Sequence, residues 1–226
     1  MRDRFIKIIA CFHVIIKLKT KSSVDDGGQG KTGQSRGLLG GGASSKRGIY
    51  TLIIFLPVER LVEVGRLGTF RFRRGYYLYT GSALGRGALS LDGRVARHLK
   101  KSKRLRWHID HLLSLEEAQV KAVITVETEE RMECEVNKYL KECMNAEVPV
   151  PGFGSSDCHG GCGSHLLFLG DRDDPSREVA QLYYEKTGIA PAFRRVRVEA
   201  SRREVQKPLK PSESLSDRPQ FCLGEP

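Results

Sequence analysis

The sequence contains no apolar run long enough to cross a lipid bilayer. Its longest candidate, residues 5–18, is interrupted by Lys7, His13 and Lys17, whereas a membrane-spanning helix needs about 20 predominantly apolar residues. We therefore expect no membrane partner. We interpret the segment as an amphipathic or unfolded leader; the alternatives are a signal peptide and an upstream extension from a misassigned start codon.

A regular cysteine framework is also missing. The six cysteines stand at positions 11, 134, 143, 158, 162 and 222 of a 226-residue chain. A chain of this length can build a core without disulfide staples. We therefore expect a reducing compartment, and specifically the cytoplasm.

Acidic residues are scarce in one part of the chain. The whole chain carries 38 Lys and Arg against 27 Asp and Glu, a net charge of +11. Residues 60–106 hold ten Arg and three Lys against two acids, whereas residues 107–170 hold four basic residues against eleven acids. This division predicts one face for phosphates and another for solvent or metal.

The basic stretch supplies candidate phosphate ligands, densest in residues 71–74 and 100–104. A run of charge is often only a solvated face, but clustering near other polar motifs favours contact with a polyanion. The candidate phosphate-binding residues are Arg71, Arg73, Arg74, Lys100, Lys101, Arg106 and His108.

Composition indicates one folded domain with extensions. Hydrophobic residues make up 39% of the chain, enough for a core, but 24 glycines and a mean hydropathy of -0.36 indicate that part of the length is not packed. We expect a flexible leader and linker over residues 1–47 and a folded domain over 48–170. After this domain we expect an accessory helix and strand over residues 171–200 and a disordered tail over residues 201–226.

Short strands dominate the start of the folded domain. Residues 48–55 are apolar, β-branched and aromatic and stop before Pro57, which predicts a largely buried strand. Residues 61–64, 69–72 and 75–79 predict further strands separated by glycines. We expect an α+β domain in which a small three-stranded antiparallel sheet, built from sequence neighbours, is flanked by helices.

Helical periodicity follows over residues 89–101. Leu91, Val95 and Leu99 form a buried stripe at four-residue steps. Arg94 and His98 form an adjacent stripe, which predicts either surface polar residues beside a core stripe or two groups that address one phosphate. Spacing alone favours the first reading.

Later segments alternate between helices and strands. Glu133 and Glu135 flank the apolar face of one predicted helix on opposite sides, so periodicity does not choose between them. The predicted helices cover residues 107–113, 129–144 and 176–186, and the predicted strands cover residues 120–127, 166–169 and 193–198.

Proline and glycine are dense over residues 148–165, which predicts a loop. Cys158, Cys162 and His165 stand in it at plausible zinc spacing, with His159, Cys134 or Cys143 as candidate fourth ligands. Because three ligands form an incomplete pattern, we favour a glycine-rich active-site loop with buried thiols over a zinc site.

Two motifs resemble those of a known family. Gly48, Ile49 and Tyr50 are followed about thirty residues later by Tyr79, Thr80 and Gly81, and this pairing resembles the GIY-YIG nucleases. Arg94 and His98 match the family's next helix, and Glu135 matches its acidic residue. Residues 79–83, 106–110 and 152–158 are similar to the Uri-type endonuclease branch, and the resemblance covers residues 48 to about 170.

The resemblance implies a metal-dependent endonuclease that hydrolyses phosphodiester bonds in DNA, structure-dependent or weakly sequence-specific, in DNA repair or recombination. Glu135 would bind Mg²⁺ or Mn²⁺, and Tyr50 would take a proton from the attacking water once neighbouring cations lowered its pKa. Arg94 would stabilise the charge on phosphate. The remaining catalytic roles fall to Tyr79, which orients water or phosphate, and to His98, which assists proton transfer.

One position departs from the family pattern. Many members carry an active-site Asn after the acidic helix, but this chain has no Asn beyond Asn145. The loop residues Ser155, Ser156 and Asp157 are candidate replacements, and His165 is a further candidate residue of the same accessory loop. The alternative functions are a nucleic-acid-binding module that kept the scaffold but lost catalysis, and an interaction platform with a structural zinc.

Overall fold

The computed structural model describes residues 46–156, 158 and 160–196. The predicted tail over residues 201–226 and nearly all of the predicted leader lie outside the described residues. Within the described part of the chain, no helix is both long and apolar enough to cross a bilayer.

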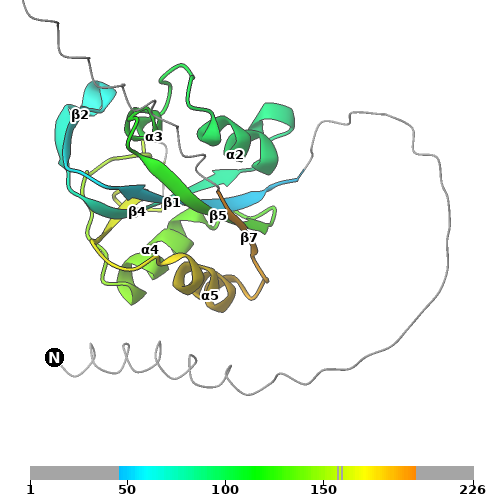
Figure 1. The fold of residues 1–226 in the computed structure, drawn as a ribbon. Coiled ribbons are helices and arrows are strands. Elements are labelled where there is room, and N and C mark those ends of the chain that lie inside the picture. The colour runs from blue at the N-terminus through cyan, green and yellow to red at the C-terminus, as the bar shows by residue number, and fades with distance from the viewer. Residues whose placement is uncertain (1–45, 157, 159, 197–226) are drawn as a thin grey trace, which may run out of the picture.

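A five-stranded antiparallel sheet forms the centre of the molecule (Figure 1), in the order β6-β4-β1-β5-β7. The two central strands of the tyrosine motifs, β1 and β4, pair along their full length. The five strands are β1 (Gly48–Leu56), β4 (Gly75–Ala83), β5 (Gln119–Glu127), β6 (Leu166–Gly170) and β7 (Ala192–Arg195).

The α+β class is confirmed, but the three-stranded sheet built from sequence neighbours is wrong. The predicted second and third strands, β2 (Arg60–Glu63) and β3 (Thr69–Phe72), form a separate two-stranded hairpin. Each buries only one of its four residues, whereas β1 buries eight of nine. Strands with so little apolar surface do not compete for the interior of a sheet that is covered on both faces.

Helices cover both faces of the sheet. The short helices α2 (Leu91–Leu99) and α3 (His108–Leu113) pack on the face that includes Tyr50 and Leu52. On the opposite face, which includes Ile49 and Ile53, α4 (Glu133–Cys143) and α5 (Ser176–Thr187) complete the core. Successive residues of β1 therefore belong to two different apolar clusters, as the alternation of a strand requires.

The helix of the predicted accessory segment reaches the centre of the sheet. Tyr183 of α5 is fully buried, and its hydroxyl lies 2.8 Å from Oγ1 of Thr51, which lies 2.8 Å from Oγ1 of Thr80. This chain of hydroxyls satisfies three buried polar groups between α5, β1 and β4. The strand β7 pairs with β5 at the edge of the sheet and is exposed along its length.

A buried ion pair joins α2 to α3. Arg97 donates from both terminal nitrogens to the carboxylate of Asp110, at 2.9 and 2.8 Å, and its guanidinium lies 3.9 Å from the ring centroid of Trp107. Asp110 is fully buried and also accepts from the backbone amides of Arg106 and Trp107. Burial alone would raise the pKa of Asp110, but these hydrogen bonds outweigh it and lower the pKa.

We predict that Asp110→Asn lowers the free energy of unfolding by about 3 kcal/mol, because it removes one partner of a buried charged pair. Since the folded pKa of Asp110 is depressed, the wild-type advantage is present above the ordinary Asp range and is lost as pH falls through the folded pKa. Urea unfolding of both proteins across acidic pH measures this difference.

The exposed pair of Arg172 and Glu178 provides the control. Glu178→Gln should cost less than about 1 kcal/mol, because water screens a surface pair. Equal costs for Asp110→Asn and Glu178→Gln would contradict the structural role of Asp110.

Candidate functional site

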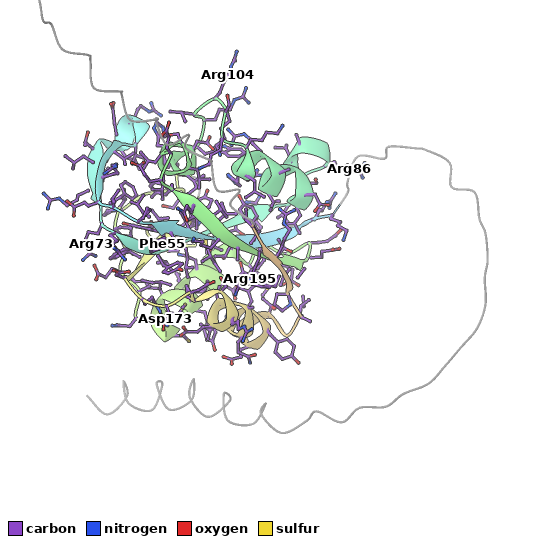
Figure 2. All side chains as sticks on the ribbon, in the orientation of Figure 1. Phe55, Arg73, Arg86, Arg104, Asp173 and Arg195 are labelled. Atoms are coloured by element: carbon purple, nitrogen blue, oxygen red, sulfur yellow. The ribbon has the colours of Figure 1, made fainter. Side chains whose placement is uncertain are left out.

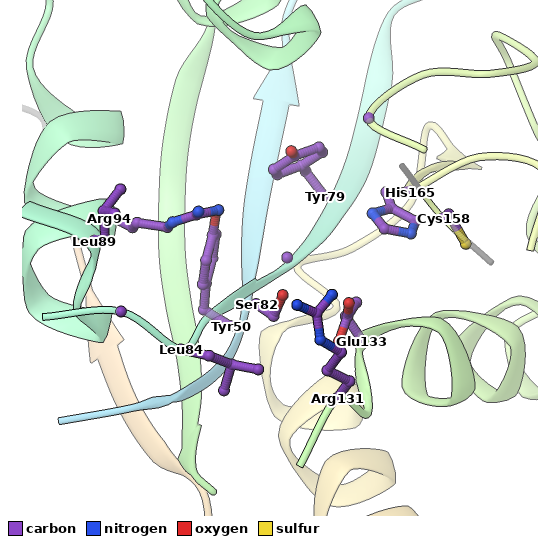
Figure 3. Close-up of a pocket in the computed structure, with 13 residues that line it drawn as sticks. Tyr50, Tyr79, Ser82, Leu84, Leu89, Arg94, Arg131, Glu133, Cys158 and His165 are labelled. Atoms are coloured by element: carbon purple, nitrogen blue, oxygen red, sulfur yellow. The ribbon is translucent and has the colours of Figure 1, made fainter. Parts of the chain in front are cut away.

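A cavity of about 310 Å³ opens beside the paired ends of β1 and β4, between α2 and the start of α4. Figure 3 shows Tyr50 and Arg94 on one side of it, and Arg131, Glu133 and His165 on the other. Phenol, guanidinium, carboxylate and imidazole groups thus come from four separate parts of the chain.

Tyr50 is nearly fully buried and forms one wall of the cavity. Its hydroxyl lies 2.8 Å from Nε2 of His98. On the neighbouring strand, Gly81 stands directly opposite Tyr50, and a Cβ atom there would lie 2.7 Å from the Tyr50 hydroxyl. The glycine that ends the second tyrosine motif therefore provides the space that the first tyrosine fills.

Burial controls the protonation of Tyr50. It raises the pKa of the phenol to about 12, although the charge of Arg94 and a hydrogen bond with it act in the opposite direction. The role implied by the resemblance requires neighbouring cations to lower this pKa, and that condition is not met, because the loss of hydration outweighs their effect. Tyr50 is a neutral phenol at neutral pH.

His98 lies in the core rather than at its edge. It is 2% exposed, and its ring contacts those of Tyr50, Tyr79 and Trp107, with centroids 5.4, 5.9 and 5.5 Å away. Burial, reinforced by the charge of Lys103, lowers the pKa of His98 to about 3. Nδ1 is buried with no hydrogen-bond partner among the described residues, so a neutral imidazole presents one nitrogen to Tyr50.

Arg94 extends from α2 so that its guanidinium lies at the hydroxyl of Tyr50 (Figure 3). The guanidinium also lies 5.2 Å from the ring centroid of Trp107. Nε is buried and has no hydrogen-bond partner within the described part of the chain. The side chain is thus a positioned cation at the cavity wall, with hydrogen-bonding capacity left over.

The acidic residue on the cavity is Glu133 and not Glu135, the residue chosen by resemblance. Glu133 lines the cavity, and its Oε2 is buried without a hydrogen-bond partner among the described residues. The Glu135 side chain is 62% exposed and lies 3.3 Å from Nζ of Lys186. Two steps along a helix rotate a side chain by about 200°, so the two carboxylates face opposite sides.

Three of the predicted phosphate ligands lie far from the cavity. Arg71, Arg73 and Arg74 precede β4, whereas the cavity lies at the other end of that strand. Each forms an ion pair, with Glu59, Glu147 and Asp171 respectively. Figure 2 shows Arg73 and Arg86 on opposite sides of the molecule.

The other predicted phosphate ligands lie nearer to α2 and α3. Lys100, Lys101 and Arg106 are exposed on the segment that connects these helices. His108 has a structural contact instead, since its Nδ1 accepts a 3.0 Å hydrogen bond from the amide of Gly154. Burial lowers the pKa of His108, which favours the neutral acceptor form.

The glycine-rich loop contributes His165, Cys158 and Gly154 to the cavity wall. Ser155 and Ser156, two of the candidate replacements for the family's Asn, are not among the residues that line the cavity. Asp157 lies outside the described residues, as does His159.

Four potential metal ligands meet beside this wall. Cys134, Cys158, Cys162 and His165 place their ligand atoms within 4.8 Å of one another. Burial alone would raise the pKa of the Cys158 thiol. Hydrogen bonds with Cys134, with the backbone and side chain of Cys162 and with His165 act in the opposite direction and lower this pKa to about 6. Burial and the neighbouring thiol of Cys158 raise the pKa values of Cys134 and Cys162. Cys143 is not part of this cluster.

Residues 49–187 match the family model described as Domain of unknown function DUF123. The chain belongs to the DUF123 family. No curated protein and no solved structure matches it. The DUF123 match runs from the first tyrosine motif to the last residue of α5, so it includes the cavity, the cysteine cluster and the helix that packs beneath β1.

Two charged residues of this DUF123 domain, Arg131 and Glu133, line the cavity but were not assigned to the site from the sequence. Arg131 stands in the turn before α4, where periodicity gives no signal. Glu133 lies three, four and seven residues before Val136, Asn137 and Leu140, whose burial only the structure shows, so periodicity alone did not select it. That spacing defines one helical face.

We predict that His98 makes folding pH-dependent. Its folded pKa of about 3 lies below the ordinary 6.5, so between these values the unfolded chain binds a proton that the folded chain does not. Stability should therefore fall as pH decreases, by about 2 kcal/mol between pH 7 and pH 5. Urea unfolding at both pH values should show a smaller loss for His98→Gln. An equal loss of stability in wild type and in His98→Gln would show that His98 is not the source of the pH dependence.

Proposed function

We propose that the protein is a metal-dependent endonuclease that hydrolyses phosphodiester bonds in DNA. One observation carries the proposal: the cavity gathers the buried phenol of Tyr50, the guanidinium of Arg94 and the unpartnered carboxylate oxygen of Glu133. The resemblance to the Uri-type GIY-YIG nucleases supports the same chemistry, with Glu133 taking the role first assigned to Glu135.

The residues on the cavity fit a divalent cation. Mg²⁺ and Mn²⁺ prefer hard oxygen ligands and commonly bind through one or two carboxylates, waters and substrate phosphate. Glu133 offers such an oxygen, buried and without a hydrogen-bond partner in the described part of the chain. When bound, the cation would act as a Lewis acid that polarises the scissile phosphate and stabilises the leaving oxygen.

Tyr50 and His98 form a path for the proton of the attacking water. At rest both groups are neutral, since the pKa of Tyr50 is about 12 and that of His98 about 3. A phosphate in the cavity adds negative charge, which favours protonated imidazole. Tyr50 then accepts the water proton as its own proton passes to Nε2 of His98, and the resulting hydroxide attacks phosphorus while the leaving oxygen departs.

Arg94 stabilises the charge that develops on the phosphate oxygens during this attack. Its planar guanidinium binds two oxygens at once, a geometry that a lysine cannot reproduce. Tyr79 is 7% exposed and lies on the same cavity. Its hydroxyl orients the phosphate or the attacking water.

The exposed segment between α2 and α3 supports a nucleic-acid substrate. Lys100, Arg104 and Arg106 are exposed there, close in sequence to the helix that carries Arg94. Contacts of this kind bind the phosphate backbone and carry little sequence information. We infer structure-dependent or weakly sequence-specific cleavage.

Glu133 and Glu135 form a matched pair for testing the proposal. We predict that Glu133→Gln lowers cleavage of supercoiled plasmid and branched DNA by at least about 100-fold in Mg²⁺ or Mn²⁺. Glu135→Gln should remain near wild type, because its side chain faces Lys186 and solvent.

DNA binding by gel shift is the control in this experiment. Glu133→Gln should still bind, since it removes the carboxylate but none of the phosphate-binding cations. Loss of cleavage in Glu135→Gln, with Glu133→Gln unaffected, would reverse the assignment of the two acids.

We predict that Arg94→Lys lowers cleavage by about 100-fold, because a point charge cannot replace two directed hydrogen bonds to phosphate oxygens. Arg74→Lys is the matched control, since Arg74 lies at the far end of β4 and pairs with Asp171. Single-turnover cleavage rates measure the difference. Near-normal cleavage by Arg94→Lys would remove Arg94 from this role.

One observation favours a second candidate, a nucleic-acid-binding module without catalysis. No Asn lies on the cavity among the described residues, and Asn137 instead donates to the carbonyl of Ser164 from within the core. In that case the wild-type protein would bind DNA with a steep salt dependence. It would cut none of the substrates, and Glu133→Gln would bind equally well.

A further inference from the structure

The cysteine cluster is assembled from two distant segments. Cys134 lies in the first turn of α4, while Cys158, Cys162 and His165 lie in the glycine-rich loop that leads into β6. Sγ of Cys134 lies 3.0 Å from Sγ of Cys158 and 3.5 Å from Nε2 of His165. Sγ of Cys162 lies 3.2 Å from Cys158 and 3.6 Å from Cys134.

We propose that Cys134, Cys158, Cys162 and His165 bind one zinc ion. Zinc in proteins binds thiolate sulfur at about 2.3 Å in a tetrahedron, whose ligand atoms are then about 3.7 Å apart. The sulfur separations of 3.0 to 3.6 Å need only a small expansion to reach that geometry. The three cysteines bind as thiolates, so any proton that a thiol still carries passes to solvent as the ion binds, while neutral imidazole supplies the fourth ligand.

The cluster is poorly explained by a disulfide. Three thiols and an imidazole meet at one point, and one disulfide would leave the third cysteine without a partner. Four soft or borderline ligands around a single point are the arrangement that structural zinc requires. Hard cations such as Mg²⁺ prefer oxygen ligands, so this site is chemically distinct from the one around Glu133.

The loop backbone is shaped to bring the ligands onto α4. Gly160 passes so close to Cys134 that a Cβ atom there would lie 2.8 Å from the Cys134 Cβ and 3.0 Å from its sulfur. Lys138, one helical turn beyond Cys134, donates a 2.5 Å hydrogen bond to the carbonyl of Gly160. A glycine at this position therefore allows the loop to lie against the helix that carries the fourth ligand.

The histidine ligand is oriented by the backbone on either side of it. Its amide donates to the carbonyl of Phe153 at 2.8 Å, and its carbonyl accepts from the amide of Thr80 on β4 at 3.0 Å. The buried amide of Asn137 donates to Ser164 at 2.7 Å. These bonds fix the end of the loop to both β4 and α4 before any ion binds.

Four protein ligands leave no open coordination position, so the zinc is structural. It fixes the loop to the first turn of α4, where Glu133 precedes Cys134 directly in the chain. Cys158 and His165 also line the cavity. The ion thus holds one wall of the cavity. The zinc site itself does not depend on the proposed nuclease function; only the importance of this wall for catalysis does.

Metal analysis of the full chain, with any affinity tag removed, tests the proposal. We expect about one zinc per chain by plasma mass spectrometry, retained through gel filtration. Replacement by Co²⁺ should give visible absorption typical of tetrahedral cobalt together with sulfur-to-metal charge transfer. Folded wild-type protein that neither contains zinc nor binds Co²⁺ in this way would overturn the proposal.

Substitutions on one helix identify the ligands. Cys134→Ser should lower zinc content to below about one tenth per chain, whereas Cys143→Ser, on the same helix but outside the cluster, should keep it. His165→Cys should retain zinc with four thiolates, while His165→Ala should lose it. Full zinc content in Cys134→Ser and His165→Ala would overturn the ligand assignment even if other variants failed to fold.

Chelation separates this inference from the proposed nuclease. A strong zinc chelator should lower the melting temperature of wild type and of Glu133→Gln alike, because the zinc site does not depend on the cavity carboxylate. Protein that contains zinc but cuts no DNA would refute the nuclease and leave the zinc site intact. Protein that cuts DNA but contains no zinc would refute the zinc site and leave the nuclease proposal intact.

Discussion

The antiparallel pairing of β1 with β4 is the constraint on which the rest of the structure depends. Its register places Tyr50 opposite Gly81 and Leu52 opposite Tyr79, so both tyrosines lie on the same face of the sheet. Because neighbouring side chains on one face of a strand pair are in contact range, this register brings the two motifs to one cavity. A slip of either strand by one residue would turn its phenol to the opposite face and separate the two tyrosines.

Burial and charge act against each other around these tyrosines, and burial dominates. Tyr50 and His98 are both neutral at rest, although Arg94 lies beside the phenol. The ion pair of Arg97 with Asp110 holds α2 against α3 and leaves Arg94, three residues earlier on α2, directed at the cavity. A rigid, partly dehydrated cation of this kind interacts more strongly with an anion than the same group would in water.

The first turn of α4 connects two kinds of chemistry. Glu133 offers a hard oxygen to the cavity, while Cys134 offers a soft sulfur to the cluster with the glycine-rich loop. Adjacent helical residues point about 100° apart, so one turn of helix can serve both. The loop, in turn, contacts the cavity through His165 and the helix through Gly160. Its position therefore links the cysteine cluster to the cavity wall.

The sequence by itself determined the features that depend on local pattern: the strands of the two tyrosine motifs, the short helix with Arg94 and His98 on one stripe, and the glycine-rich loop with three ligand-type side chains. Hydrophobic alternation and helical periodicity encode these directly. Only the tertiary structure decided which strands pair, that Glu133 rather than Glu135 faces the cavity, and that Cys134 completes the cluster. Strand partners, the rotation of α4 about its axis and contacts between distant segments depend on how the core packs, which no local pattern records.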